Sequence, residues 1–316
     1  MSKFYLGVDG GQSSTVALIC NEQGRIVGHG RGGPCNHVSG PEGREKFFQA
    51  VGGCLHSAGL EACFDPRSSE FASACLGFSG GAEDKVGYTK ELIKSARYHV
   101  THDAEIALTG ATGGEPGIIT IAGTGSIAFG RNAEGKMARA GGWGYIFGDE
   151  GGAFDIARQA VRAALYMEEG WGTETILLER LLQATNSATA SQLLHQFYAE
   201  FDRVAIARLA PLVTAAAQEG DPSALQIVEY AAHHLANLAI GVYRMLFHRG
   251  QLPAVSFIGG VFESKFVLSG FKREIKSEMG VEAAAPMYPP AAGALLQALR
   301  MDGNFSQLSN LPDIKQ

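Results

Sequence analysis

The sequence has no long apolar segment, no basic cluster and no paired cysteine motif. None of its apolar runs approaches the roughly 18 residues that span a bilayer, and no basic-then-apolar leader precedes the first strand. The five cysteines form no C-x-x-C pair and have no histidine partner at zinc-finger spacing. A net charge of −6 without a basic run argues against a nucleic-acid partner. These absences predict a cytoplasmic protein with reduced thiols and no membrane partner.

Glycine is abundant instead, at 42 of 316 residues, in a chain with 46% hydrophobic residues. This composition is typical of a compact α/β enzyme with many backbone-lined loops, not of a disordered or fibrous chain. A chain of 316 residues exceeds the size at which one core usually divides. Two domains are therefore expected.

The most informative stretch is 117–157. A β-branched apolar run at 118–122 predicts a buried strand, and a returning strand begins near Ile127. The turn between them consists of Gly123, Thr124, Gly125 and Ser126. Its glycines let backbone N–H groups converge and its hydroxyls add donors, so it can hold a phosphate. An ordinary glycine hairpin gives the same pattern.

A second glycine-dense loop follows within thirty residues and opens a long helix. It contains Gly141-Gly142-Trp143-Gly144 and then Gly148-Asp149-Glu150-Gly151-Gly152. Acidic residues at a helix N-terminus can simply cap the helix. One of them is enough for a cap, and a cap needs neither the flanking glycines nor the tryptophan. The loop is therefore a candidate binding element.

The N-terminal segment repeats the strand, glycine turn and strand pattern. The strand at 4–8 ends on Asp9, Gly10, Gly11, Gln12 and Ser13, and a second strand covers 16–20. Two hydroxyl-tipped hairpins facing each other could grip one polyphosphate between them. Asp9, at the C-terminal end of its strand, is placed to hold a hydrated Mg²⁺ against that polyphosphate. A plain turn remains the alternative for this motif alone.

Polar residues also follow the next strands, at the end where open α/β sheets bind ligands. The strand at 72–78 ends on Ser79 and Gly80, and the strand at 98–101 leads to Asp103 at a helix start. Small neighbours leave room beside Asp103, which we predict to be a catalytic base; a helix-capping aspartate is the alternative. The glycine-rich loop that ends in Asn36 and His37 is a candidate substrate contact or a surface loop.

The rest of the chain is mostly helical. Helices are expected at 150–168, 173–184, 189–199, 203–219 and 222–249. A buried strand at 254–258 then ends on Gly259 and Gly260, a glycine pair that lets a flat ring such as adenine approach the backbone. A helix start after a strand explains this pair equally well. A last helix covers 290–301, and the tail is expected to be loosely held.

Three of these motifs, in this order, resemble the two phosphate motifs and the adenosine motif of the actin, heat-shock ATPase and sugar-kinase superfamily. They are Asp9-Gly10-Gly11 with its hydroxyl run, Ile121 to Ser126, and Ile258-Gly259-Gly260-Val261. The block from Gly141 to Gly151 closely resembles the N-acetylglucosamine kinases and their relatives in the BadF/BadG/BcrA/BcrD ATPase family. The resemblance covers nearly the whole chain, from Phe4 to about Arg300.

The resemblance implies two ribonuclease-H-like lobes with ATP in the cleft between them. These would be an N-terminal lobe at 1–113, to which the helix 290–302 can be joined, a C-terminal lobe at 114–289, and a tail at 303–316. Asp103 matches the family's catalytic aspartate. Ser13 and Thr124 match its phosphate contacts, and Gly259 and Gly260 fall where adenosine packs. The sugar contacts it implies are Asn36, Gly142, Trp143, Gly144 and Asp149.

The implied reaction is ATP- and Mg²⁺-dependent phosphorylation of an amino sugar. N-acetyl-D-glucosamine is the preferred candidate substrate because of Asn36-His37 and the block 143–149. Glucosamine and N-acetylmuramic acid are the alternative substrates. Relatives of this kind are often dimers, so a homodimer is expected. The first phosphate loop has Gly11-Gln12-Ser13 where Gly-Gly-Thr is commoner, which leaves the role of Gln12 open.

Two other functions fit the same family. A dehydratase activator couples ATP hydrolysis to electron transfer from an iron–sulfur cluster, but that cluster needs cysteines at the subunit interface, and no cysteine follows Cys75. A non-enzymatic sugar sensor or repressor would need a DNA-binding segment. The few residues before the first strand leave no room for a helix-turn-helix.

Overall fold

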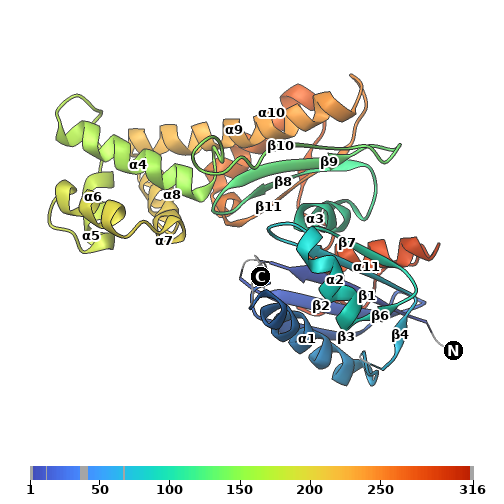
Figure 1. Cartoon of the computed structure of the whole chain (residues 1–316). Helices are drawn as coiled ribbons and strands as arrows, with labels where there is room; N and C mark the ends of the chain where they lie inside the picture. Colours follow the sequence, from blue (N-terminus) through green and yellow to red (C-terminus); the bar gives the residue numbers. More distant parts are fainter. Residues whose placement is uncertain (1–2, 12, 36–41, 67, 314–316) are drawn as a thin grey trace. The chain divides into compact units, whose positions relative to one another are not determined.

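The computed structural model describes residues 3–11, 13–35, 42–66 and 68–313. None of the helices in these ranges combines the length and the apolar character that a membrane crossing requires. The chain divides into two compact units. Unit 1 consists of Met1–Glu115 and Pro286–Gln316, and unit 2 consists of Pro116–Ala285. Figure 1 labels the elements of both units.

Unit 1 is built on a five-stranded sheet with the order β3-β2-β1-β5-β7. The strands β3, β2 and β1 are antiparallel neighbours, whereas β5 pairs parallel with both β1 and β7. The strands are β1 Phe4–Gly10, β2 Thr15–Asn21, β3 Ile26–Gly32, β5 Ser73–Phe78 and β7 Tyr98–His102, with β4 Glu70–Phe71 and β6 Lys94–Ser95 as a separate short pair. The helices are α1 Gly43–Ala62, η1 Glu83–Lys85, α2 Val86–Leu92, α3 Asp103–Thr112 and α11 Pro290–Met301.

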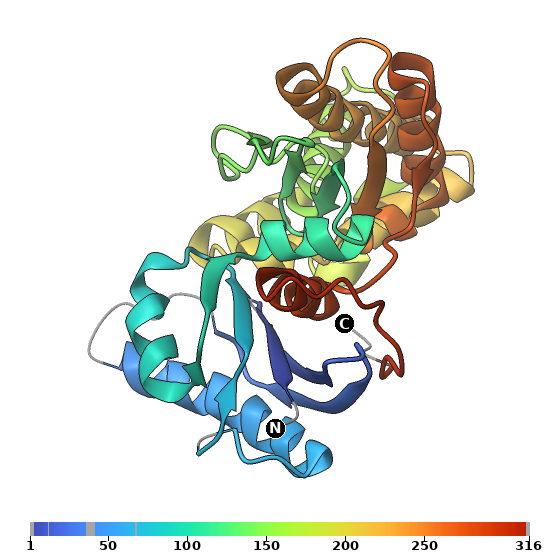
Figure 2. The ribbon, with the colours of Figure 1, turned by 90° about the vertical axis from the view of Figure 1, so that its right-hand side faces the viewer.

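Alternation along the strands gives this sheet two apolar faces, because successive side chains of a strand point to opposite sides. Leu6 and Ile19 pack with α1, while their neighbours Tyr5 and Leu18 pack with α11. Figure 2 shows α1 and α11 on opposite faces of the strands. A Cβ on Gly7 would lie 2.4 Å from the Leu295 nitrogen, so the glycine permits the close approach of α11 to β1.

Unit 2 repeats the strand order of unit 1. Its sheet runs β10-β9-β8-β11-β12, with two antiparallel pairs followed by two parallel pairs. The strands are β8 Gly117–Ala122, β9 Ser126–Arg131, β10 Met137–Gly141, β11 Ala254–Ile258 and β12 Ala283–Ala284. In both units the central antiparallel hairpin is therefore followed, across the sheet, by parallel strands whose carboxyl ends share one edge.

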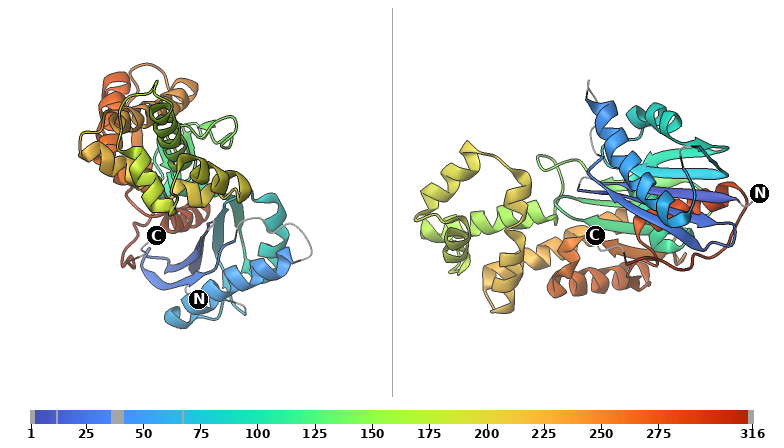
Figure 3. Two further views of the ribbon diagram at one scale, coloured as in Figure 1. Left: turned by 90° about the vertical axis from the view of Figure 1, so that its left-hand side faces the viewer. Right: turned by 90° about the horizontal axis from the view of Figure 1, so that it is seen from below.

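Helices supply most of the core of unit 2. The helix α9 crosses the strands β8, β9 and β10 and packs against α10. Figures 1 and 3 show α5 to α8 gathered beside α4, beyond the strands of this unit. The helices are α4 Ala153–Glu168, α5 Leu177–Thr185, α6 Ala190–Ala199, α7 Arg203–Ala207, α8 Ala210–Gln218, α9 Pro222–Leu246, η2 Gly260–Glu263 and α10 Lys265–Met279.

Two expectations about the elements are wrong. The single helix expected at 203–219 is two helices, α7 and α8, and Pro211 lies at the first turn of the second. The tail is not loosely held over residues 303–313, since Leu308 is buried and the Ile26 N–H donates to the Ser309 carbonyl at 3.0 Å. The C-terminal segment is thus part of the packing of unit 1.

Candidate active site

The site in unit 1 lies at the carboxyl ends of β1, β5 and β7. Gly10 on β1, Phe78 on β5 and His102 on β7 are paired across the parallel strands. The residues beside this row, Asp9, Ser79 and Asp103, therefore lie next to one another at one edge of the sheet. The Ser79 N–H donates to the Gly10 carbonyl at 3.0 Å, which joins the first two strand ends.

Asp103 is the first residue of α3, and both of its carboxylate oxygens have partners. The Ser79 hydroxyl donates to Oδ2 at 2.5 Å, and the Ala104 N–H donates to Oδ1 at 2.8 Å. Ser79 is buried and Asp103 is half-buried. The carboxylate is therefore held in one orientation at a partly open edge, as a proton acceptor for a bound substrate requires.

Asp9 is close enough to Asp103 to interact with it electrostatically. Burial, and then the negative charge of Asp103, raises the pKa of Asp9 from 3.8 to about 7. Two carboxylates at one edge repel each other, and a divalent cation would relieve that repulsion. In the described part of the chain no cluster of three or more His, Cys, Asp or Glu side chains could hold a metal. A Mg²⁺ held by Asp9 would therefore complete its coordination with water and substrate oxygens.

A buried lysine supports the loop after β5. Lys85 is 0% exposed, and its ammonium group donates to the Gly81 carbonyl at 2.7 Å and to Asp84 Oδ1 at 3.0 Å. Gly80 and Gly81 have φ angles of 77° and 104°, which residues with a Cβ rarely adopt. Lys85 thus fixes the loop that carries Ser79. The sequence analysis missed this residue.

The tip after β1 carries the first predicted phosphate loop. The Gly11 N–H donates to the Ser14 carbonyl at 2.9 Å, which closes the turn, and Ser13 is exposed. A Cβ on Gly10 would lie 2.2 Å from the Phe78 ring, so this position requires glycine for packing. The predicted contacts Gln12, Asn36 and His37 lie outside the described residues.

In unit 2 the glycine tip after β8 packs onto the start of α4. The Ala153 and Phe154 N–H groups donate to the carbonyls of Gly123 and Thr124 at 2.8 and 3.1 Å. The Ser126 hydroxyl donates to the Glu150 carbonyl at 2.7 Å, so it ties the tip to the second glycine loop. The backbone groups of the tip, rather than the Ser126 side chain, are thus the candidates for a phosphate contact.

Asp149 lies beside the glycine tip after β8 and forms an ion pair with Arg203. It has a φ of 64°, an uncommon conformation for a residue with a side chain. Its Oδ2 atom lies 3.3 Å from Nη2 of Arg203, and a Cβ on Gly125 would lie 2.3 Å from the same oxygen. Strained conformations of this kind cost about 1–3 kcal/mol and are concentrated at functional sites. Arg203 is a further residue that the sequence analysis missed.

The other predicted sugar contacts of unit 2 lie beside the same tip. The Gly142 N–H donates to the Ser126 carbonyl at 3.0 Å, and Gly142 and Gly144 have φ angles of 69° and 82°. Trp143 between them is 66% exposed, and the Arg139 guanidinium lies 4.6 Å from its ring centroid. An exposed aromatic ring held on a glycine frame is available to a ligand.

A cavity of about 460 Å³ in unit 2 lies beside the predicted adenosine motif. It is lined by Gly123 and Thr124 from the tip and by Gly260 from η2. These come together because Ile258 on β11 pairs with Ile121 on the parallel strand β8. Gly259 lies behind them, where a Cβ would lie 2.2 Å from the Ala122 carbonyl oxygen. The cavity is large enough for a nucleoside, and it lies directly beside a loop of the type that binds phosphate.

The segment 208–218, which contains α8, supplies polar lining residues that the sequence analysis did not identify. They are Arg208, Thr214 and Gln218, and Glu263 follows on η2. Nothing in their local sequence marks them, because they meet the tip after β8 and η2 only around the cavity of the folded unit.

Two units of identical strand order, each with a glycine tip after its first strand, define the two ribonuclease-H-like lobes of an actin-like ATPase. A model of the BadF/BadG/BcrA/BcrD ATPase family matches residues 6–298, and the chain belongs to this family.

The relatives that are most similar in sequence are named as sugar kinases. An N-acetylmuramic acid/N-acetylglucosamine kinase of Clostridium acetobutylicum is 32% identical over 83% of this chain and 86% of that protein. An N-acetyl-D-glucosamine kinase of Dictyostelium discoideum is 30% identical over 95% of this chain and 99% of that protein. A solved Chromobacterium violaceum structure, assigned to the N-acetylglucosamine kinases, has a TM-score of 0.75 at 27% identity and covers 93% of this chain and 98% of its own. These similarities support the assignment of the chain to the sugar kinases.

Proposed function

We propose that this chain transfers the γ-phosphate of ATP to an amino sugar, with N-acetyl-D-glucosamine as substrate and its 6-phosphate as product. The observation that carries the proposal is the hydrogen-bonded pair of Ser79 and Asp103 beside Asp9. The names of the relatives support the substrate class. Glucosamine and N-acetylmuramic acid are the competing substrates.

Asp103 is the proposed base. A sugar hydroxyl is a weak nucleophile until its proton has an acceptor, and an aligned base typically contributes about 10² to 10⁴ in rate. The hydrogen bonds from Ser79 and from the Ala104 N–H fix the carboxylate and leave its remaining lone pairs for the substrate hydroxyl. Little other covalent chemistry is required, because phosphoryl transfer depends mainly on positioning and on stabilisation of charge.

Asp9 is the proposed anchor for Mg²⁺, which when bound would neutralise charge on the phosphate oxygens. Asp9 lies near the carboxyl end of β1. A proton occupies its side chain for part of the time near neutral pH, because its pKa is about 7. A metal ion would be held by the ionised form of Asp9, and Asp103 is the proposed acceptor of the substrate proton.

The nucleotide is proposed to bind residues of both units. Its phosphates would contact the tip at 10–13 and the tip at 123–126. Its adenosine would enter the cavity lined by Gly260. The sugar would contact Asn36, His37, Ser79 and Gly80 from the first lobe and Gly142, Trp143, Gly144 and Asp149 from the second. We also propose that the protein is a homodimer and that it acts in the cytoplasm.

The test is release of ADP, measured with a panel of N-acetylglucosamine, glucosamine and N-acetylmuramic acid, each with and without Mg²⁺. We expect sugar-dependent turnover, highest with N-acetylglucosamine and absent without the metal. Asp103→Asn should lose about 10² to 10⁴ in turnover with sugar affinity nearly unchanged. Normal turnover of that variant would remove Asp103 from the mechanism, and turnover independent of every sugar would overturn the kinase proposal.

The burial of the cysteines argues against the alternative that the chain is a dehydratase activator. Cys20, Cys35, Cys54 and Cys75 are buried, and burial raises the pKa of each thiol, to about 11 for Cys35 and about 12 for Cys54. Thiols in such surroundings pack as small apolar side chains and are poor ligands for a cluster. Iron and sulfide in protein purified without oxygen would restore this alternative.

A further inference from the structure

A second cavity of unit 2 lies where the C-terminal half of α4 faces the first turns of α9. Its volume is about 430 Å³, and none of the candidate site residues named above lines it. Three aromatic side chains contribute to its wall: Tyr166 from α4, Trp171 from the following loop and Tyr230 from α9. Aromatic walls with a few polar groups are typical of sites for small molecules.

Trp171 is exposed and yet fixed in position. It is 63% exposed, its ring centroid lies 3.8 Å from that of Tyr166, and its indole N–H donates to Glu169 Oε2 at 2.7 Å. A side chain held from two directions loses little further conformational freedom when a ligand binds. Trp171 therefore offers a preorganised flat apolar surface at the mouth of the cavity.

The polar groups of the cavity are mostly neutral. Gln159 and Gln226 contribute carboxamides, and Thr173 and Ser223 contribute hydroxyls. Arg162 supplies the charge in the lining, and its guanidinium group already donates to the Tyr166 hydroxyl at 3.1 and 2.9 Å. Carboxamides and hydroxyls both donate and accept hydrogen bonds, so the lining matches a ligand rich in hydroxyl groups better than a phosphate.

We propose that this cavity binds a neutral saccharide, with one pyranose ring stacked on Trp171 and its hydroxyls bonded to Gln159 and Gln226. A pyranose ring has a C–H face that packs on an aromatic ring and a rim of hydroxyl groups that matches carboxamides. A neighbouring hollow of about 450 Å³ shares Thr173 with this cavity. A disaccharide therefore has room to continue beyond the first ring and should bind more tightly than a monosaccharide.

The cavity is connected to the second glycine loop through one buried carboxylate. Gln159 donates to Asp155 Oδ2 at 3.3 Å, and the same oxygen accepts the Gly151 N–H at 3.0 Å. Asp155 is 2% exposed, and Arg158 holds its other oxygen at 2.6 Å. A saccharide that fixes Gln159 would thus restrict the backbone next to Asp149. This consequence for the proposed sugar site rests on the proposed function, whereas binding to the cavity does not.

The test uses the fluorescence of Trp171. The chain has two tryptophans, so Trp143→Phe leaves Trp171 as the sole reporter. This protein is titrated without ATP with N-acetylglucosamine and with its β-1,4-linked disaccharide. We expect a saturable change in emission, with a dissociation constant of about 1 mM or below for the disaccharide. Gln226→Ala in the same background should weaken binding about fivefold, and the control Gln196→Ala on α6 should not.

Three results would overturn the proposal. One is the lack of a saturable change in emission with either sugar, and another is equal binding by the Gln226→Ala protein. The third is a dependence of Trp171 emission on protein concentration together with loss of a dimer in Trp171→Ala, which would identify the surface as a subunit interface. Failure of ADP release would leave the fluorescence result unaffected, so the two proposals fail independently.

Discussion

The Ser79 hydroxyl donates a 2.5 Å hydrogen bond to Oδ2 of Asp103, and this bond links the ends of two parallel strands. Ser79 is itself fixed by its N–H group, which donates to the Gly10 carbonyl on the neighbouring strand. The orientation of the proposed base is therefore set by the register of β1, β5 and β7. Three predictions concern this edge of the sheet, and a fourth concerns Asp302 elsewhere in unit 1.

Removal of the Ser79 hydroxyl should lower turnover while the fold persists. In Ser79→Ala the Asp103 carboxylate loses one of its two fixed partners, and misalignment of a reacting group can cost about 10- to 100-fold in rate. We expect kcat for sugar phosphorylation to fall within that range, with a thermal transition close to that of the parent protein. The matched control is Ser57→Ala on an exposed face of α1. Unchanged kcat in Ser79→Ala would show that the bond has no role in orientation.

Asp9→Asn should stabilise the metal-free protein at alkaline pH. The pKa of Asp9 is raised from 3.8 to about 7 in the folded state, so the folded chain keeps a proton that the unfolded chain loses between these values. The free energy of unfolding of the parent protein therefore decreases as the pH rises from about 4 to 7, and the variant escapes that loss. After solvent screening is allowed for, the gain at pH 8 should be about 1–3 kcal/mol.

Urea unfolding of both proteins in EDTA, at pH 5 and pH 8, measures this difference. The gain should be larger at pH 8 than at pH 5, and the variant should have lost Mg²⁺-dependent turnover. A stabilisation independent of pH would contradict the ionisation argument, because an uncharged asparagine would then be acting through packing alone.

Lys85→Met should reduce turnover through the loop after β5. The substitution keeps the apolar stem but leaves the Gly81 carbonyl and Asp84 without the ammonium group, so the loop that carries Ser79 loses its support. We expect kcat to fall about tenfold or more. Lys90→Met, on the exposed face of α2, is the control. In the double variant with Ser79→Ala the two losses should be less than additive, because both act through Asp103. If the two losses in kcat were fully additive, Lys85 would stabilise the protein without acting through Asp103.

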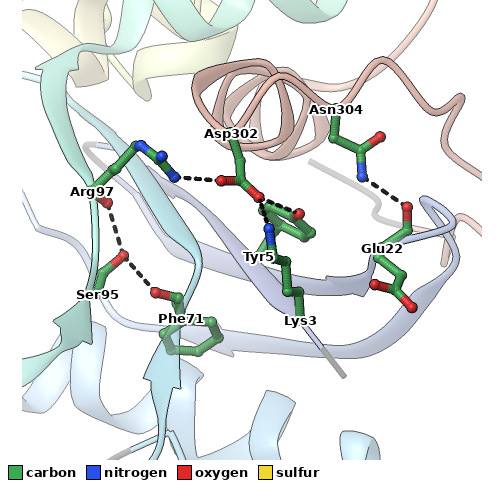
Figure 4. Close-up of polar contacts among 8 residues, drawn as sticks. All are labelled: Lys3, Tyr5, Glu22, Phe71, Ser95, Arg97, Asp302 and Asn304. Carbon is green, nitrogen blue, oxygen red and sulfur yellow. Dashed lines mark hydrogen bonds and ion pairs between the residues drawn. The ribbon is translucent and has the colours of Figure 1, made fainter. Parts of the chain in front are cut away.

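Asp302 should stabilise unit 1 in a pH-dependent way. Its carboxylate accepts hydrogen bonds from the Lys3 ammonium and the Tyr5 hydroxyl, both at 2.8 Å, and pairs with Arg97 (Figure 4). The hydrogen bonds from Lys3 and Tyr5 hold the pKa of Asp302 below its usual range. The resulting stability is present above the unfolded pKa of about 4 and is lost as the pH falls through the lower folded value.

Asp302→Asn should therefore lower the free energy of unfolding by about 1–2 kcal/mol at pH 7, and the difference should shrink below about pH 4. Thermal unfolding across this range, with Asp313→Asn as an exposed control, measures the effect. A difference that stays constant down to pH 2 would show that charge on Asp302 does not stabilise the fold.

The strand ends of both units could be predicted from the sequence because local composition determines them. An apolar run that ends in glycines and polar residues marks the end of a buried strand, as at Asp9, Ser79 and Gly123. The break at 208–209 was not predicted because apolar residues continue at helical spacing on both sides of it. Pro211, which suits the first turn of a new helix, was the available signal.

The residues around the two cavities could not be predicted in the same way. Gln218 and Tyr230 have ordinary helical neighbours in the sequence, and they meet their cavities only because distant segments pack together. Lys85 was missed for a related reason. It follows Glu83 and Asp84, a charged context that indicates a solvated turn, whereas the structure buries its side chain completely.

The close approach of α11 to β1, which Gly7 permits, has a consequence for biosynthesis. Unit 1 needs residues near both ends of the chain, from Phe4 to Leu308, whereas unit 2 is continuous in sequence. Synthesis of unit 2 is complete before α11 is made, whereas unit 1 lacks one of its two packing helices until then, and domains generally fold as units once they are complete. The sheet edge that carries Asp9 and Asp103 therefore belongs to a unit that cannot complete its packing until α11 has been made.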